Sequence, residues 1–309
     1  MNGHASHAQG SGHASDPGPV RVDTDRRWLV GALVLITSFM AAEVVVGFVV
    51  NSIALLSDAA HMLTDAAALA LALVALQLAK RPPSGGYTYG LRRAEILSAQ
   101  ANGITLIVLA AWLGYEAVLR LTHPEPVRGL PMLLTALAGV VVNLVATWLI
   151  GRADRRSLNI EGAYRHILTD LAAFIATAVA GVIILLTGFR QADSLASLVV
   201  VALMVQAGVG LVRDSGRILL EAAPAGIVPE RVGHDLAGFD GVVDVHDLHV
   251  WEITSGSPAL SAHVIVRPAL DCHQLRLDLE ELLRERYHLT HTTLQVDHAQ
   301  PTVHWITRG

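Results

Sequence analysis

The sequence predicts an α-helical membrane protein with six transmembrane helices, followed by a smaller cytosolic α+β domain. Of its 309 residues, 52% are hydrophobic and only 16% are charged, and the mean hydropathy is +0.48, which is more apolar than a soluble domain. The apolar residues are concentrated between about 28 and 213, and the remainder has ordinary globular polarity. We therefore predict a disordered leader at 1–27, a transmembrane domain at 28–213 and a cytosolic domain at 214–309.

A transmembrane helix needs roughly 20 apolar residues to cross a hydrocarbon core of about 30 Å. Six runs reach that length, at 28–50, 53–79, 94–119, 130–151, 160–188 and 192–212. The leader before them is rich in Gly and Ser and contains Pro, as disordered chain often is, and its three histidines would bind metal only weakly.

The distribution of basic residues predicts how the helices are oriented, because Lys and Arg are retained on the cytoplasmic side. If the N-terminus is inside, twelve Lys and Arg residues near the spans fall on the inner face. Only Arg120, Arg128 and Arg190 fall on the outer face. We expect a multi-pass protein of the cell inner membrane with both termini in the cytoplasm.

Charge and cysteine content exclude several classes of protein. The formal net charge of −5 gives no reason to expect a nucleic-acid partner. Cys272 is the single cysteine, so the chain has no internal disulfide and no four-cysteine zinc site.

Two near-identical motifs place ionisable residues inside apolar runs. The motif HMLTD contains His61 and Asp65, and HILTD contains His166 and Asp170. Residues four apart share a helix face. Counting 1.5 Å per residue places both pairs near the middle of the membrane. If the two helices pack face to face, two imidazoles and two carboxylates form a tetrahedral set suited to Zn²⁺, and the two carboxylates balance its charge.

Each pair taken alone has a simpler explanation, because an intramembrane His or Asp often only hydrogen-bonds between helices. The repetition at similar depth favours the metal site. Asp58 lies three residues before His61 on a neighbouring part of the same face. It could line the path, relay protons or serve as a helix contact.

The same four residues can couple metal to protons. Metal binds only when the imidazoles are neutral and the carboxylates ionised, so metal and protons displace one another. Histidine has an ordinary pKa near physiological pH, which makes His61 and His166 the expected proton carriers.

The tail shows the order helix, strand, strand, helix, strand, at about 229–238, 243–253, 259–266, 271–288 and 291–298. It is rich in histidine. Strand alternation predicts that His246 and His249 face opposite sides of the sheet, which would keep them from sharing a metal site.

Four segments together resemble the cation diffusion facilitator family in its zinc-transporting branch, over about 28–298. They are SIALLSDAAHMLTDAAALALAL, YTYGLRRAEILSAQANG, NIEGAYRHILTD and DVHDLHVWEITSG. The resemblance implies a homodimer, a ferredoxin-like cytosolic domain and export of a divalent metal in exchange for protons. It assigns His61, Asp65, His166 and Asp170 as transport ligands. It implies Zn²⁺ as substrate and potential regulatory ion, with no organic cofactor. Cd²⁺ and Co²⁺ stay open as further substrates.

The resemblance also implies two sets of residues outside the membrane. His246, His263 and His273, with Asp297 as a fourth, match ligands of cytosolic metal sites; surface or strand-pair histidines are the alternative. Gln295 replaces a ligating histidine of some relatives. Arg93 and Glu221 match a charged interlock of the dimer; two unrelated charges on an arginine-rich face are the alternative.

Two other functions stay open on the sequence alone. An intramembrane zinc protease would need a general base, usually the glutamate of HExxH, and an open coordination position. Neither HxxxD motif has that glutamate. A channel or a metal sensor that does not transport would use the same ligands. The loop at 152–159 lacks histidine, so the His-rich loop of animal zinc transporters is absent, which favours a bacterial type of exporter.

Overall fold

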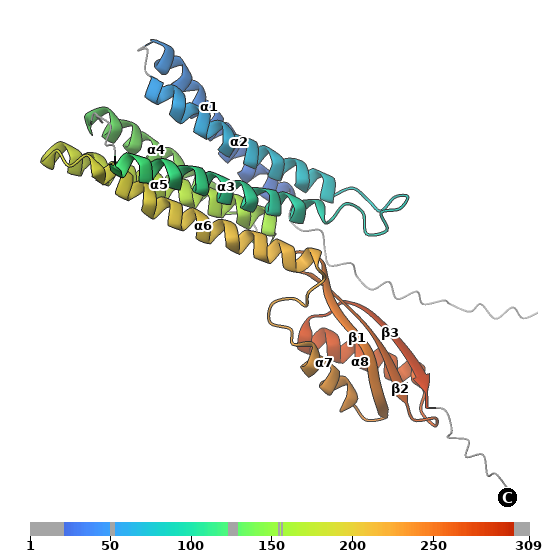
Figure 1. Ribbon diagram of the computed structural model, residues 1–309. Coiled ribbons are helices and arrows are strands. Elements are labelled where there is room, and N and C mark those ends of the chain that lie inside the picture. The colour runs from blue at the N-terminus through green and yellow to red at the C-terminus, as the bar shows by residue number, and fades with distance from the viewer. Residues whose placement is uncertain (1–21, 50–52, 123–128, 154, 156, 300–309) are drawn as a thin grey trace, which may run out of the picture.

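The computed structural model describes residues 22–49, 53–122, 129–153, 155 and 157–299 (Figure 1). Of the predicted leader, only 22–27 belong to this part. Within the helix Ile53–Ala79, the side chains of Asp58 and His61 lie outside the described part of the structure.

Six long helices run side by side as one bundle (Figure 1). They are α1 (Val22–Val49), α2 (Ile53–Ala79), α3 (Ala94–Thr122), α4 (Gly129–Ile150), α5 (Leu158–Thr187) and α6 (Gln191–Leu219). Among the described residues, five helices are long and apolar enough to cross a membrane, and α2 adds the apolar stretch Asp65–Ala79. The prediction of six transmembrane helices is confirmed.

The helices extend furthest beyond the predicted apolar spans at two places. Helix α1 begins at Val22 and α6 continues to Leu219. A helix can continue past the hydrocarbon because polar side chains are solvated there, so hydropathy alone does not locate its ends.

An apolar cluster joins α1, α2, α4 and α5, with Leu29, Met62, Ile150 and Ile167 among its buried members. Helices α3 and α6 meet elsewhere through two glycines. A Cβ on Gly208 would lie 2.9 Å from the carbonyl oxygen of Gly103, so only glycine permits this approach. Small residues at such contacts are typical of membrane helix packing.

The C-terminal domain follows α6 and confirms the predicted order of elements. It contains α7 (Pro229–Ala237), β1 (Val242–Thr254), β2 (Ser257–Val266), α8 (Cys272–Tyr287) and β3 (His291–His298). The sheet order is β1-β2-β3, with β1 antiparallel and β3 parallel to β2. Helices α7 and α8 cover one face of this sheet (Figure 1). This is the expected α+β, ferredoxin-like arrangement.

The other face of the sheet carries histidines, and one expectation about them is wrong. His246 pairs with His263, and His249 pairs with Ser261, so β1 contains one extra residue between these pairs. Such a bulge resets the alternation of side chains. Asp247 within it has a φ of 53°. His246 and His249 therefore lie on the same exposed face.

Candidate metal centre

Helices α2 and α5 bring together three of the four predicted transport ligands. Ligand atoms of Asp65, His166 and Asp170 all lie within 4.8 Å of one another. Nε2 of His166 is 2.9 Å from Oδ1 of Asp65 and 3.7 Å from Oδ2 of Asp170. The predicted packing of the two HxxxD motifs against each other agrees with this geometry.

All three residues are buried: Asp65 is 5% exposed, His166 is 2% exposed and Asp170 is 6% exposed. Among the described residues, Nδ1 of His166 has no hydrogen-bond partner. Charges and polar atoms in an apolar interior are costly unless they are paired or coordinate a metal. One imidazole nitrogen and two carboxylates are oxygen and nitrogen donors that Zn²⁺ accepts.

Each of the two helices has a small buried residue near the site. Ala66 follows Asp65 directly, and Ala163 lies three residues before His166; both belong to the buried apolar cluster. Small residues of this kind are common where membrane helices pack.

The fourth predicted ligand and the predicted path residue are both in α2. His61 precedes Asp65 by one helical turn, which places it on the same helix face. The side chains of His61 and Asp58 lie outside the described residues, so their roles stay predictions.

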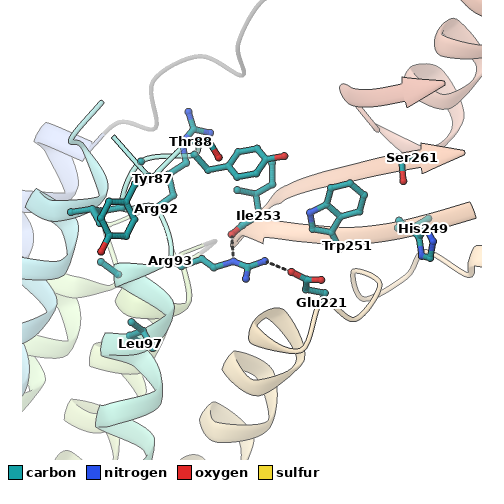
Figure 2. A pocket seen from close by; sticks show the side chains of 16 residues that line it. Tyr87, Thr88, Arg92, Arg93, Leu97, Glu221, His249, Trp251, Ile253 and Ser261 are labelled. Carbon is teal, nitrogen blue, oxygen red and sulfur yellow. Dashed lines mark hydrogen bonds and ion pairs between the residues drawn. The ribbon is translucent and has the colours of Figure 1, made fainter. Parts of the chain in front are cut away.

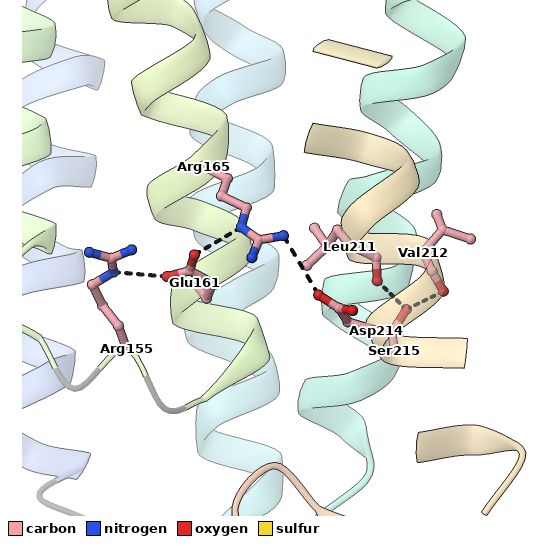
Figure 3. A network of polar contacts seen from close by, with 7 residues as sticks. All are labelled: Arg155, Glu161, Arg165, Leu211, Val212, Asp214 and Ser215. Carbon is pink, nitrogen blue, oxygen red and sulfur yellow. Dashed lines mark hydrogen bonds and ion pairs between the residues drawn. The ribbon is translucent and has the colours of Figure 1, made fainter. Parts of the chain in front are cut away.

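A polar network lies at the start of α5, close to the site in sequence (Figure 3). The carboxylate of Glu161 accepts hydrogen bonds from Arg155 and Arg165, each at 2.8 Å. Arg165, next to His166, is also 3.7 Å from Asp214 of α6. The network connects the α4–α5 loop, α5 and α6.

Arg93 and Glu221, the predicted interlock pair, lie together where the bundle meets the C-terminal domain (Figure 2). Nη2 of Arg93 is 3.4 Å from Oε1 of Glu221, and its Nε donates to the carbonyl oxygen of Ile253 in β1 at 3.3 Å. The pair borders a cavity of about 920 Å³ that is also lined by Tyr87 and Trp251. The structure brings the two charges together within one protomer; their role in a dimer stays a prediction.

A second junction connects the two domains through Glu95, which is 8% exposed. Its carboxylate contacts the hydroxyl of Thr254 and accepts a hydrogen bond of 3.1 Å from Ser157. The neighbouring Ser255 accepts a hydrogen bond of 3.2 Å from the backbone N–H of Leu158. The turn between β1 and β2 thus touches the beginning of the helix that carries His166.

The predicted cytosolic ligands are distributed over the sheet and α8. The rings of His246 and His263 have centroids 5.4 Å apart. His273 lies in the first turn of α8, and Asp297 accepts a hydrogen bond from Gln295 at 2.9 Å. Among the described residues, these four do not form a metal-ligating group comparable to that in the membrane.

An additional carboxylate lies beside these histidines. Oδ1 of Asp247 is 3.0 Å from Nε2 of His249, and its Oδ2 is 3.9 Å from Nε2 of His263. The hydrogen bond and the charge of His249 hold the pKa of Asp247 below its ordinary value. Strand alternation did not identify Asp247, because the sequence pattern of β1 does not reveal the bulge.

Sequence reasoning also missed polar residues that connect helices. Glu95 belongs to no motif, and its partner Thr254 is distant in the chain. Glu161 has its partners Arg155 and Arg165 close in sequence, but charge pairs at such spacing are common on helices and did not identify it. Asn159 is seven residues before His166 and therefore on the same face of α5, and its side chain hydrogen-bonds to α2. That spacing could have identified it as a neighbour of the site.

Comparisons with known proteins agree with this arrangement. The family model for the cation efflux transmembrane domain matches residues 29–220, and the model for the cytoplasmic domain of cation efflux proteins matches 224–299.

Several curated relatives match most of the chain. A cadmium, cobalt and zinc/H⁺-K⁺ antiporter of Bacillus subtilis is 36% identical, covering 88% of this chain and 89% of the relative. The zinc transporter ZitB of Pectobacterium atrosepticum is 36% identical, covering 87% of this chain and 85% of the relative. The metal cation efflux system protein CzcD of Cupriavidus metallidurans is 36% identical, covering 93% of this chain and 90% of the relative.

One solved structure, the metal-bound C-terminal domain of the CzcD transporter from Cupriavidus metallidurans, is 30% identical. It covers 23% of this chain and 99% of that chain, with a TM-score of 0.22.

Proposed function

The chain belongs to the cation efflux family, and from this premise we propose that it exports Zn²⁺ from the cytosol in exchange for protons. Cd²⁺ and Co²⁺ are further substrates within the proposal, because the donor set accepts them and the Bacillus subtilis relative is named for all three metals. The family consists of transporters and not of enzymes.

One observation carries the proposal: Asp65, His166 and Asp170 converge in the buried interior of the bundle. With His61 as fourth ligand, two carboxylates and two neutral imidazoles give a closed tetrahedral shell. A fully ligated ion with balanced charge is what a low-dielectric interior tolerates best.

The exchange follows from competition at these ligands. Zinc entering from the cytosol displaces protons from the imidazoles and carboxylates, and protons entering from outside displace zinc. Alternating exposure of the site to the two sides then couples the fluxes. Exchange of one Zn²⁺ for one H⁺ moves one net charge outward, which costs about 2.3 kcal/mol per 100 mV of inside-negative potential. Exchange for two H⁺ is electroneutral.

The proposal includes the assembly and its orientation. The excess of cations on one side supports an inner-membrane protein with both termini in the cytoplasm. An even number of helices agrees with this, since the start of α1 and the end of α6 then lie on the same side. The cytoplasmic-domain match supports a homodimer. His246, His263, His273 and Asp297 would serve a regulatory metal there.

The protease alternative lacks support. Neither HxxxD motif supplies a glutamate that could act as general base. A shell of four ligands would also leave no open position for a substrate water. The sensor alternative differs from transport in predicting binding without metal movement.

Reconstitution into sealed vesicles tests the proposal. With a zinc-sensitive dye in the lumen, we expect zinc movement to depend on an imposed pH gradient and to stop in His166→Ala. Zinc binding without movement would support the sensor, and movement that ignores the pH gradient would contradict antiport.

A further inference from the structure

Asn159 forms a hydrogen bond between two helices at the inner end of the bundle. It is the second residue of α5, its side chain is 2% exposed, and Nδ2 donates to the carbonyl oxygen of Ala72 in α2 at 2.8 Å. A carbonyl inside a helix has two lone pairs, so it can accept this bond in addition to its own helical one.

This bond is separated from the metal centre by the same number of residues along both helices. Asn159 precedes His166 by seven residues on α5, and Ala72 follows Asp65 by seven residues on α2. Seven residues are close to two turns, or about 10.5 Å along each helix. Because α2 and α5 run in opposite directions, both contacts belong to the same line of contact in the same register.

We propose that Asn159 is a positioning residue for the metal centre: its hydrogen bond to Ala72 sets the register of α2 against α5 that places Asp65 beside His166. This inference rests on the proposed function, because it assumes that these two residues bind the metal. Asn159 itself is not one of the proposed ligands.

Apolar packing also favours particular offsets, because large buried side chains of both helices, such as Leu69 and Ile160, belong to one cluster. The hydrogen bond of Asn159 adds a directional constraint to this packing. A slip by one residue would move Asp65 by about 1.5 Å along the axis and turn it by about 100°. A directional polar bond favours one offset, as buried polar groups do in coiled coils.

The bond has little freedom to adapt. The acceptor is fixed in the backbone of α2, and the Asn159 side chain is short. Leaving its buried amide without a partner would also carry a desolvation cost. A displaced register would therefore lose this bond at the same time as it separates Asp65 from His166.

Asn143 offers a matched control within the same bundle. Its side chain is 4% exposed, and Nδ2 donates to the carbonyl oxygen of Gly139 at 3.1 Å, four residues earlier in its own helix α4. Asn143→Leu removes a buried amide of the same kind without removing a bond between helices. A difference in metal affinity between Asn159→Leu and Asn143→Leu therefore reports on the helix register and not on the loss of a polar group.

The experiment measures binding of Co²⁺ and Zn²⁺ to the purified full-length chain in detergent. The His166→Ala variant defines which part of the signal belongs to the membrane site, so cytosolic binding is subtracted. The visible absorption of Co²⁺ reports whether its coordination is tetrahedral. Thermal unfolding of each variant is followed in parallel.

For Asn159→Leu, we expect metal affinity to fall by about tenfold, the magnitude seen when supporting residues of metal sites are changed. We expect the tetrahedral Co²⁺ absorption to weaken. Asn143→Leu should retain wild-type affinity and spectrum, even if it lowers thermal stability by the same amount.

Each outcome decides a separate question. If Asn159→Leu keeps wild-type affinity and spectrum while His166→Ala loses the site, the positioning role is wrong and the metal centre stands. If His166→Ala binds like wild type, the proposed function itself fails. Should Asn159→Leu not fold, Asn159→Ala removes the same donor with a smaller side chain, and the same comparison applies.

Discussion

Nε2 of His166 and Oδ1 of Asp65 are 2.9 Å apart, although the two residues are separated by 101 positions in the chain. The contact joins the fifth helix to the second. The proposed donor set therefore forms only when these two helices pack together, and each proposed ligand depends on the other helix for its neighbours.

Removal of one ligand should abolish transport and leave the fold intact. We expect Asp170→Ala and His61→Ala to stop zinc efflux while the protein stays folded and dimeric, because an opened shell loses metal affinity by more than about 100-fold. Zinc efflux from vesicles and size-exclusion chromatography measure the two properties. Full transport by either variant would remove it from the ligand set.

The chemical type of the ligand should determine metal choice. His61→Asp replaces a nitrogen donor with an oxygen donor, and harder ions such as Mn²⁺ favour oxygen. We expect the ratio of Mn²⁺ to Zn²⁺ transport to rise in a competition assay. An unchanged zinc preference would argue against His61 as a ligand.

The contact between Arg93 and Glu221 predicts a rescue by charge reversal. Glu221→Arg should impair transport by repulsion, and adding Arg93→Glu should partly restore it. Both side chains are partly exposed, at 38% and 65%, so we expect a change in stability below about 1 kcal/mol. Vesicle efflux measures the effect. A double variant no better than the worse single variant would exclude the interlock.

The junction at Glu95 predicts that a threonine of the C-terminal domain affects transport. Thr254→Val keeps the shape of the side chain and removes the contacts of its hydroxyl with the Glu95 carboxylate and with the carbonyl oxygen of Arg92. One hydrogen bond contributes about 1 kcal/mol, so we expect a several-fold fall in transport rate. Thr293→Val, at an exposed position of β3, is the matched control. Equal rates in both variants would show that the junction does not govern transport.

Replacing two glycines of α6 with alanine should change the stability of the protein in opposite directions. A Cβ at Gly208 would meet Ile107 at 2.8 Å, whereas one at Gly216 would meet nothing within 4 Å. We expect Gly208→Ala to destabilise the protein by about 1–3 kcal/mol. Gly216→Ala should stabilise it by up to about 1 kcal/mol, through helix propensity. Thermal unfolding in detergent compares them, and equal shifts would contradict the close α3–α6 contact.

Much of the fold could be predicted because its signals are local. Each membrane helix is a continuous apolar run, and each element of the C-terminal domain has its own period. The HxxxD motifs also repeat a local spacing, which made the pairing of Asp65 with His166 predictable before any contact was known.

Features that depend on tertiary contacts could not be predicted in this way. The bulge at Asp247 breaks the alternation of β1, and a single aspartate inside a strand pattern is too weak a signal to predict it. Glu95 contacts Thr254, which is 159 positions away. Unlike the HxxxD pairs, Glu95 and Thr254 do not belong to a repeated motif, so the sequence contains no signal that links them.

Through the contact between Ser255 and Leu158, the C-terminal domain caps the first turn of a transmembrane helix. The first N–H groups of any helix lack intrahelical partners. Ser157, at the N-cap position of α5, makes no capping bond to α5; its hydroxyl donates to Glu95 instead. Ser255 of the C-terminal domain supplies the missing cap to Leu158. A truncated chain that ended after α6 would therefore have a frayed α5, with loosened first turns below His166, so its transport could not be read as that of an independent membrane module.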